Sequence, residues 1–371
     1  MVSVDRKSQL SLITLALLGC ALALEVLVWG VGRAGARTVR HSVQGSSGSL
    51  DFFVDGVPGE SPVQKWPAVL KGVAVWLEIV GALTLAAAAW PLLLAVAVFV
   101  GWRLRVLQEV GHVLVHTGLG LFLFVTDLIW SLPMAQRSAQ QRYVRHVELH
   151  HGNGTLSTID PHRASVRSWL MALESLPLGD EGSGTRPLTR SLGVLAWSDL
   201  RLAVFGSEPD GGHRLAVSRQ RGIVLLSVLL PLSFLPFASE PVRAAIVGWL
   251  IARSVVYPVL AWFSELLEHH WAAGPVDADS HVQSELQLGH VLAADTLLNW
   301  LIVVGLQPFG ERFHMLHSLR PDLSPASLGA AHAELLGSCA DYRCKVVRPL
   351  DALTSLLRSD AGDLLTSLGS E

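Results

Sequence analysis

The chain has 371 residues, of which 50% are hydrophobic and only 16% are charged, and its formal net charge is −3. A soluble domain usually has about 25% charged residues, so this composition, together with apolar runs of twenty or more residues, excludes an ordinary soluble protein, a disordered chain and a secreted disulfide scaffold. The small net charge also argues against a nucleic-acid partner. The sequence therefore predicts an all-α integral membrane protein.

Four apolar segments are predicted to cross the membrane, because a spanning helix needs about 20 consecutive apolar residues. The first, interrupted only by Glu25, is too long for a signal peptide and is interpreted as a retained anchor. The second is interpreted as one tilted helix with a kink at Pro91. The third and fourth follow each other closely and are predicted to form a tight helical hairpin. The four predicted spans are residues 10–31, 73–102, 222–237 and 242–263.

Four spans in two hairpins place both chain ends, residues 102–221 and the chain after residue 264 on one side of the membrane. Residues 102–221 contain 13 arginines, whereas the loop between the first two spans has few basic residues. Positively charged loops face the cytoplasm, so we expect the long stretch there, in a histidine-rich helical cap. The predicted division is 1–66 for the anchor helix and an extracytoplasmic loop, 67–345 for the membrane domain, and 346–371 for a C-terminal tail.

Nine of the 15 histidines fall in four short windows. Within the first two windows, histidines four residues apart would share one face of a helix and could hold one metal ion together. The third window directly follows the fourth predicted span, and the fourth contains an i, i+3 pair. The windows are His112 and His116; His146, His150 and His151; His269 and His270; His314 and His317.

Each window alone is also compatible with ordinary histidines in a core or at a membrane surface. Histidine at a membrane face is costly unless it serves a function, and all four windows are predicted on the same face. Imidazole with some carboxylate suits iron, zinc or copper. More than four histidines exceed a tetrahedral zinc site and favour two metals. Two irons would suit oxygen activation, with lipid-like substrates supplied by the membrane.

Three sequence stretches resemble the membrane fatty acid desaturase superfamily. They are QEVGH at 108–112, YVRHVELHH at 143–151 followed by DP, and LLNWL with FHMLHSLRP near the end. The order of spans and windows is also similar, so the resemblance covers roughly residues 70–340. It implies histidine boxes that hold a di-iron centre for O₂ activation. The second window and the Glu-His pair after the fourth span look more like the alkane hydroxylase branch.

Two positions depart from the family pattern. If QEVGH is aligned with the HExGH form of the first box, Gln108 stands in place of a histidine ligand, and Ser318 replaces the last histidine of the third box. A register shifted to His112 and His116 is an alternative, although the match around Glu109 favours the first alignment. The resemblance then implies the metal ligands His112, His146, His150, His151, His269, His314 and His317, with His116 or His270 as substitutes.

Four glutamates near the windows could orient the imidazoles by accepting their other N–H group. Each is also compatible with an ordinary solvated or interfacial charge. They are Glu109, Glu148, Glu265 and Glu268.

The resemblance implies a desaturase-like oxidoreductase of the plasma membrane, which uses non-haem iron and O₂ to desaturate or hydroxylate an acyl chain or another lipid-like molecule. The chain has no evident redox module of its own, so an external electron donor of the ferredoxin or cytochrome b5 type is expected. Substrate identity, regiochemistry and the choice between desaturation and hydroxylation do not follow from the sequence.

Two alternatives stay open. The replacements at Gln108 and Ser318 are compatible with a non-catalytic or altered-metal paralogue of the same fold. QEVGH also differs by one residue from the HExxH motif of metalloproteases, in which Glu109 would be the general base. The protease interpretation leaves the other three histidine windows without a role.

Overall fold

The computed structural model describes residues 6–44, 50–61, 65–134, 136–152, 160, 230–270 and 281–358. The described part is helical apart from one short parallel pair of strands, in which Val291 lies opposite Val346 and Leu292 opposite Val347. The predicted all-α class is therefore confirmed. The strands are β1 (Val291–Leu292) and β2 (Val346–Val347).

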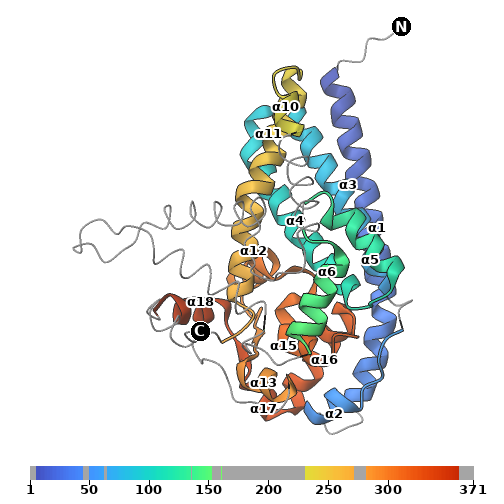
Figure 1. Cartoon of the computed structure of the whole chain (residues 1–371), viewed down its shortest axis with the longest axis vertical. Helices are drawn as coiled ribbons and strands as arrows, with labels where there is room; N and C mark the ends of the chain where they lie inside the picture. Colours follow the sequence, from blue (N-terminus) through green and yellow to red (C-terminus); the bar gives the residue numbers. More distant parts are fainter. Residues whose placement is uncertain are drawn as a thin grey trace, which may run out of the picture.

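Four helical stretches of the described residues are long and apolar enough to cross a membrane. They lie along the long axis of the molecule (Figure 1). The candidate spans are Ser8–Gln44, Trp66–Ala88, Trp90–Val115 and Glu240–Leu266. Their elements are α1 (Arg6–Gln44), α3 (Trp66–Ala88), η2 (Trp90–Leu92), α4 (Leu93–Val115), α11 (Glu240–Ile251), η6 (Ala252–Val256) and α12 (Tyr257–Leu266).

The prediction of one kinked span over residues 73–102 is wrong, because the chain turns back there and forms two spans. Ala89 leaves the helical conformation at φ −140° and ψ 77°, and Pro91 lies in the short 3₁₀ turn that follows. A Cβ at Gly72 would lie 3.4 Å from Val110, whereas α3 and α4 meet at their other ends near the turn. The apolar pattern did not reveal the break because the turn residues Trp90, Pro91 and Leu92 are themselves apolar.

The other predicted spans have different outcomes. The first and fourth correspond to the candidate spans Ser8–Gln44 and Glu240–Leu266. The predicted third span, 222–237, lies mostly outside the described residues, and its described part contains only the short helix α10 (Leu230–Phe234). The two-hairpin arrangement and the division at residues 66 and 345 stay predictions.

The remaining helices lie mainly at one end of the molecule, with α2, α13, α15 and α17 at the opposite end from α10 (Figure 1). They are α2 (Leu50–Asp55), α5 (Gly120–Thr126), η3 (Asp127–Ser131), α6 (Ala139–Arg142), η4 (Tyr143–His150), α13 (His281–Leu288), α14 (Leu297–Leu306), η8 (Pro308–Phe313), α15 (His314–Leu319), α16 (Pro325–Ser338), α17 (Ala340–Arg343) and α18 (Pro349–Arg358).

Residues 50–61, which we expected in an extracytoplasmic loop, pack against the helix that carries the fourth window. The guanidinium of Arg320, next to α15, donates hydrogen bonds to the backbone oxygens of Phe53 (3.1 Å) and Val57 (2.7 Å). Phe53 and Val57 are also buried in one apolar cluster with Leu316 of α15. These contacts form because α1 continues past its arginines to Gln44 and brings this segment against α15 and α16, while the position of the segment relative to the membrane stays a prediction.

A polar cluster inside the membrane-spanning part joins α1 to the α3–α4 hairpin. Glu25 of α1 forms ion pairs with Lys71 of α3 and with Arg103 of α4, and Arg103 also pairs with Glu78. The cluster holds two carboxylates and two cations. Charges in a membrane are tolerated when they are paired, so this neutral cluster fixes the position of α1 on the hairpin.

Replacing Glu25 by Gln is expected to lower the free energy of unfolding by about 1–3 kcal/mol. Breaking a buried ion pair typically costs more, but the Glu25 side chain is 26% exposed, which weakens the effect. Thermal unfolding of the purified protein in detergent measures the change. The exposed Asp55 gives a control, because Asp55→Asn removes a carboxylate that has no ion pair among the described residues. Equal stability of both variants would contradict the anchoring role.

Candidate metal centre

The four histidine windows meet at one end of the bundle, where α4 and α12 end. The first window lies on the last turn of α4, the second on η4, the third directly after α12, and the fourth on α15. Eight histidines form two groups in which potential ligand atoms lie within 4.8 Å of one another. The first histidine group is His112, His116, His146, His151 and His317, and the second histidine group is His150, His269 and His314.

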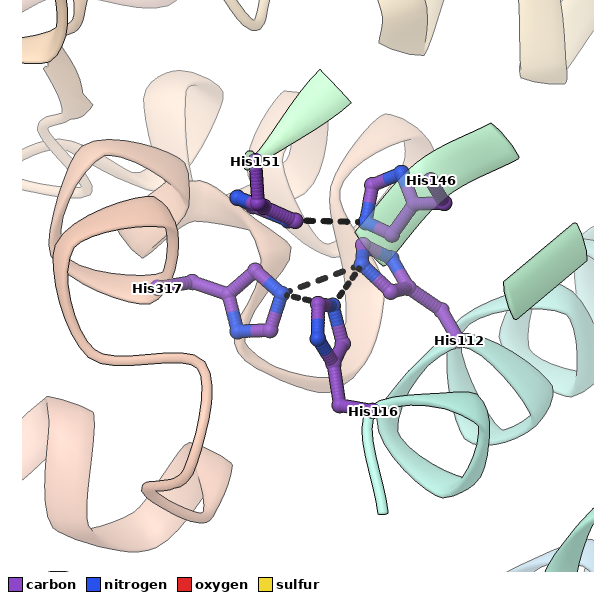
Figure 2. Close-up of side chains that lie close together, drawn as sticks. All are labelled: His112, His116, His146, His151 and His317. Atoms are coloured by element: carbon purple, nitrogen blue, oxygen red, sulfur yellow. Dashed lines mark hydrogen bonds between the residues drawn. The ribbon is translucent and has the colours of Figure 1, made fainter. Parts of the chain in front are cut away.

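In the first histidine group the Nε2 atoms point toward a common centre (Figure 2). The Nε2 atom of His317 lies 3.0 Å from that of His112 and 2.9 Å from that of His116. The Nε2 atoms of His112 and His116 are 3.1 Å apart. Those of His146 and His151 are 3.0 Å apart. Five rings from three separate segments thus present the same nitrogen to one small volume.

This spacing fits a metal better than a hydrogen-bond network. A neutral imidazole has a single N–H, so three Nε2 atoms that are all about 3 Å from each other cannot satisfy one another as donors and acceptors. A metal with bonds of about 2.1 Å to nitrogen would place two ligands at a right angle about 3.0 Å apart. The donor type and the distances of the first histidine group therefore fit a transition metal.

The protonation of the first group also suits metal binding. Burial lowers the pKa of His116, His146 and His317 well below the usual histidine value, and neighbouring imidazoles of the group lower these pKa values further. The three rings are therefore neutral at physiological pH. The neutral imidazole is the form that binds a metal through its free lone pair.

The winding of η4 decides which histidine of the second window joins which group. This segment is π-helical, and the backbone N–H of His151 donates to the oxygen of His146 at 3.0 Å. In a π-helix, residues five apart rather than four apart are neighbours. His146 and His151 therefore share the first histidine group, and His150 points to the second.

The second histidine group has carboxylates on the outer nitrogens of two of its rings. The Nδ1 atom of His150 lies 3.0 Å from Asp160 Oδ1, and that of His314 lies 2.7 Å from Glu311 Oε1. When a carboxylate accepts the Nδ1–H, the Nε2 lone pair is left for a metal. Glu268 forms a further candidate group with Glu311 and His314.

These carboxylates raise the pKa values of the two rings by more than burial lowers them. Burial by itself lowers the pKa of both histidines, but Asp160 raises the pKa of His150 above its usual value. Glu268 and Glu311 together raise the pKa of His314 to about 9. The raised pKa values show that carboxylates make the surroundings of the second histidine group electrostatically negative, which favours a divalent cation that displaces the proton from each ring.

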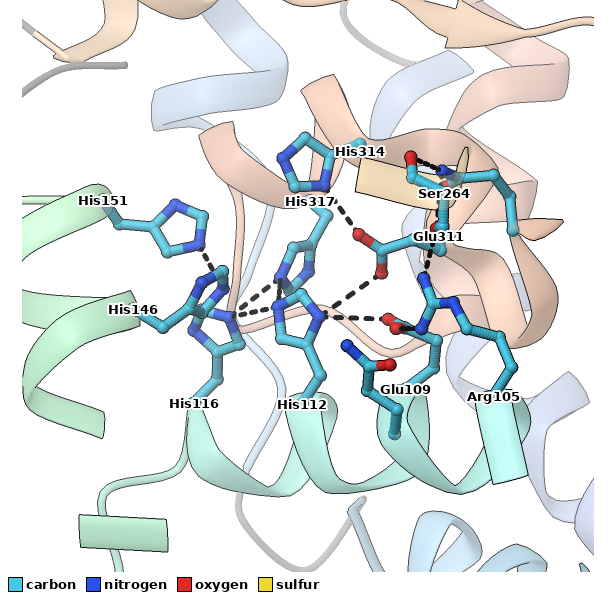
Figure 3. Close-up of polar contacts among 12 residues, drawn as sticks. Arg105, Glu109, His112, His116, His146, His151, Ser264, Glu311, His314 and His317 are labelled. Carbon is cyan, nitrogen blue, oxygen red and sulfur yellow. Dashed lines mark hydrogen bonds and ion pairs between the residues drawn. The ribbon is translucent and has the colours of Figure 1, made fainter. Parts of the chain in front are cut away.

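A buried polar layer lies behind the two groups (Figure 3). Glu109 Oε2 lies 3.1 Å from His112 Nδ1, and Glu311 Oε2 lies 3.4 Å from the same atom. Arg105, which is 1% exposed, forms an ion pair with Glu109 and donates a hydrogen bond to the hydroxyl of Ser264. The layer therefore balances part of the buried negative charge with one arginine.

The structure favours the shifted register of the first box over the alignment that the sequence favoured. Gln108 accepts a hydrogen bond from the hydroxyl of Tyr257 at 2.9 Å, whereas His116 belongs to the first histidine group. His112 and His116 are instead the two histidines that α4 contributes. The similarity of QEVGH to the HExGH motif favoured the position of Gln108 as a ligand position. The last turn of α4 instead directs His112 and His116 to the centre of the first histidine group.

The remaining predicted site residues have different positions. His270 belongs to neither histidine group; it is exposed, and its ring lies 4.6 Å from that of His290. Ser318 is buried on α15. Glu268 is buried and Glu265 half-buried near the end of α12, whereas Glu148 is exposed on η4.

Three residues of the site were missed by the sequence analysis. Glu311 precedes His314 by three residues on a helical turn, which is a spacing that could have indicated the contact. Asp160 was noted only as part of the DP that follows the second window, although it reaches His150 from ten residues further along the chain. Arg105 had no signal beyond its position one turn before Glu109.

The comparisons with known proteins agree with this architecture. A family model described as "Fatty acid desaturase" matches residues 66–348. The match begins at the first residue of α3 and ends directly before α18, so it includes all residues of both histidine groups. The comparison with curated proteins finds no match.

Proposed function

The chain belongs to the fatty acid desaturase family, since the model of that family matches more than half of its length, and from this membership we propose a specific activity. We propose that the protein is an O₂-dependent non-haem iron oxidoreductase that desaturates or hydroxylates an acyl chain or another lipid-like molecule. The family implies an oxidoreductase in a membrane with a lipid substrate. The iron, the O₂ and the type of reaction are the proposal.

The proposed function rests on one observation: eight histidines from four windows that are distant in the sequence converge in two adjacent groups. Rings of the two groups are close, since the centroids of His150 and His151 lie 5.0 Å apart. Five imidazoles in one group and three imidazoles with nearby carboxylates in the other are donor sets that iron accepts. Two adjacent donor groups of this kind would hold two metals, the arrangement that the proposed oxygen chemistry needs.

On this proposal the eight histidines hold two irons, which when bound supply the activation of O₂ needed to break a C–H bond. The residues of the chain orient and protect that chemistry. Asp160 and Glu311 accept the Nδ1–H groups of His150 and His314 and so direct their Nε2 atoms inward. Burial of the rings keeps bulk water away, with His150 at 0% exposure. Electrons would come from an external donor of the ferredoxin or cytochrome b5 type.

We further propose that the histidine end faces the cytoplasm, from a plasma membrane location. With residues 50–61 against the helix of the fourth window, the arginines near the C-terminal end of α1 and Lys65 before α3 also lie on the histidine side, which increases its positive charge. The turn at Ala89–Leu92, at the other end, carries no charge. This difference supports the cytoplasmic orientation. The basic residues concerned are Arg33, Arg37, Arg40 and Lys65.

The iron content of the full-length protein tests the proposed function directly. After anaerobic loading with Fe(II) and removal of excess metal, about two irons per chain are expected. Extraction of lipids from cells that express the protein then identifies the oxidised product, with a His150→Ala variant as the inactive control. A wild-type chain that retains no iron after loading would refute the proposal.

A second candidate is a metal-binding paralogue without oxidase activity. The observation that favours it is the second histidine group, which has three histidines while the buried Ser318 occupies the last position of the third box. This candidate predicts bound metal without an oxidised lipid product. The protease alternative has less support, because Glu109 is engaged with Arg105 and with the outer nitrogen of His112.

A further inference from the structure

Glu311 lies between the two histidine groups and contacts a ring of each. Its Oε1 accepts a hydrogen bond from Nδ1 of His314, in the second group, at 2.7 Å. Its Oε2 lies 3.4 Å from Nδ1 of His112, in the first group. The side chain is 7% exposed. Figure 3 shows the carboxylate with one oxygen directed to each ring.

Two other carboxylates at the site each contact a ring of one group. Glu109 reaches His112 and Asp160 reaches His150, at 3.1 Å and 3.0 Å. When Nε2 of His112 binds a metal, the single proton of the ring is on Nδ1, so Glu109 and Glu311 share one donor. A change at Glu311 therefore alters the hydrogen bond that remains for Glu109, as well as the orientation of His314.

The backbone before α15 holds Glu311 in this place. It lies in η8, where Phe309 has φ 56° and Gly310 has φ 93°. A Cβ at Gly310 would lie 2.6 Å from Pro325, so only glycine fits there. Phe309 adopts a conformation that is costly for a bulky residue. The turn is thus fixed on both sides, and Glu311 has little freedom to follow only one of the two rings.

We propose that Glu311 is a positioning residue that couples the two metal positions, so that the loss of its charge alters both of them at once. This inference rests on the proposed function, because it needs metal in both groups. An imidazole that donates its Nδ1–H to a carboxylate is a stronger ligand through Nε2. Through Glu311, the strength of His112 toward one metal and of His314 toward the other depend on the same carboxylate.

Three isosteric variants of the full-length chain distinguish this coupling from support of one group only. Glu311→Gln is the test variant, and the other two are controls. Glu109→Gln is the control for the first group and Asp160→Asn is the control for the second. Each variant is loaded anaerobically with Fe(II), and the two irons are followed by Mössbauer spectroscopy and by their rates of release to a chelator. No turnover is needed for either measurement.

Glu109→Gln is expected to alter the spectral component of one iron and to speed one phase of iron release. Asp160→Asn is expected to do the same for the other iron. Glu311→Gln is expected to alter both components and to speed both phases by about 10–100-fold. If Glu311→Gln changes only the component that Asp160→Asn changes, or neither component, the coupling is refuted while the proposed function stands. A wild type without iron would refute the proposed function itself.

Glu311→Asp keeps the charge and provides a second test if the Gln variant is poorly folded. The shorter side chain cannot reach both rings, and the contact to His112 is already the longer one. Glu311→Asp is therefore expected to alter the component that Glu109→Gln alters and to leave the other close to wild type. Two unchanged components would again contradict the coupling.

Discussion

Replacing His317 by Ala is expected to remove the metal of the first histidine group and to reduce turnover by at least about 100-fold, since loss of a side chain that only supports a ligand already costs about 10–100-fold. His317 is the ring whose Nε2 lies within 3.0 Å of those of both His112 and His116. Metal analysis should fall from about two irons per chain to about one. The second histidine group, which His317 does not join, should keep its metal.

His270 provides the matched control for this result. It is also a histidine near the end of a spanning helix, and the sequence pattern made it a candidate ligand. Its ring lies against His290 and outside both groups. His270→Ala is expected to retain full iron content and activity within about twofold of wild type. Loss of iron in His270→Ala, or full iron in His317→Ala, would contradict the assignment of the first group.

Replacing Arg105 by Met is expected to destabilise the fold by about 3–5 kcal/mol, which is the usual cost of removing one partner from a buried ion pair. Arg105 is almost completely buried and pairs with Glu109, which would be left as an unpaired buried carboxylate. The lost hydrogen bond to Ser264 adds to the effect. Thermal or denaturant unfolding of the metal-free protein in detergent measures the change.

The double variant Arg105→Met, Glu109→Met distinguishes lost charge pairing from lost packing. Replacing both members of a buried pair by apolar residues is often close to neutral for stability. The double variant is therefore expected to regain most of the lost stability but not the wild-type metal affinity, because His112 has lost one of its two carboxylates. A double variant as unstable as Arg105→Met would show that the packing of the guanidinium, rather than its charge, stabilises this region.

The sequence predicted the fold class and most of the histidines that converge, because those features are local. Apolar runs indicated the spans, and histidines three to five residues apart indicated groups that one helical face can hold. Those signals were sufficient for seven of the eight histidines that converge. His116 was ranked as a substitute ligand only because the alignment of QEVGH with HExGH placed the first ligand position at Gln108.

The features that the sequence did not predict depend on contacts between distant segments. The turn at Ala89 is formed by apolar residues, so the hydropathy pattern continued through it. The position of residues 50–61 depends on hydrogen bonds from Arg320, more than 250 residues away. Glu311 gains its importance from His112, which belongs to another helix. None of these contacts leaves a periodic signal.

The π-helical winding of η4 has a consequence for how the metal positions are composed. If the same residues were wound as an α-helix, His146 and His150 would share a face, and His151 would turn away from the first group. The division of the histidines between the two positions is thus set by the winding of η4, whose hydrogen bonds join residues five apart instead of four, and not by the order of the residues alone. A single-residue deletion between His146 and His150 would leave His146 and His151 four residues apart, so an ordinary α-helix would then hold this pair on one face, whereas the intact segment needs π-helical winding to do so.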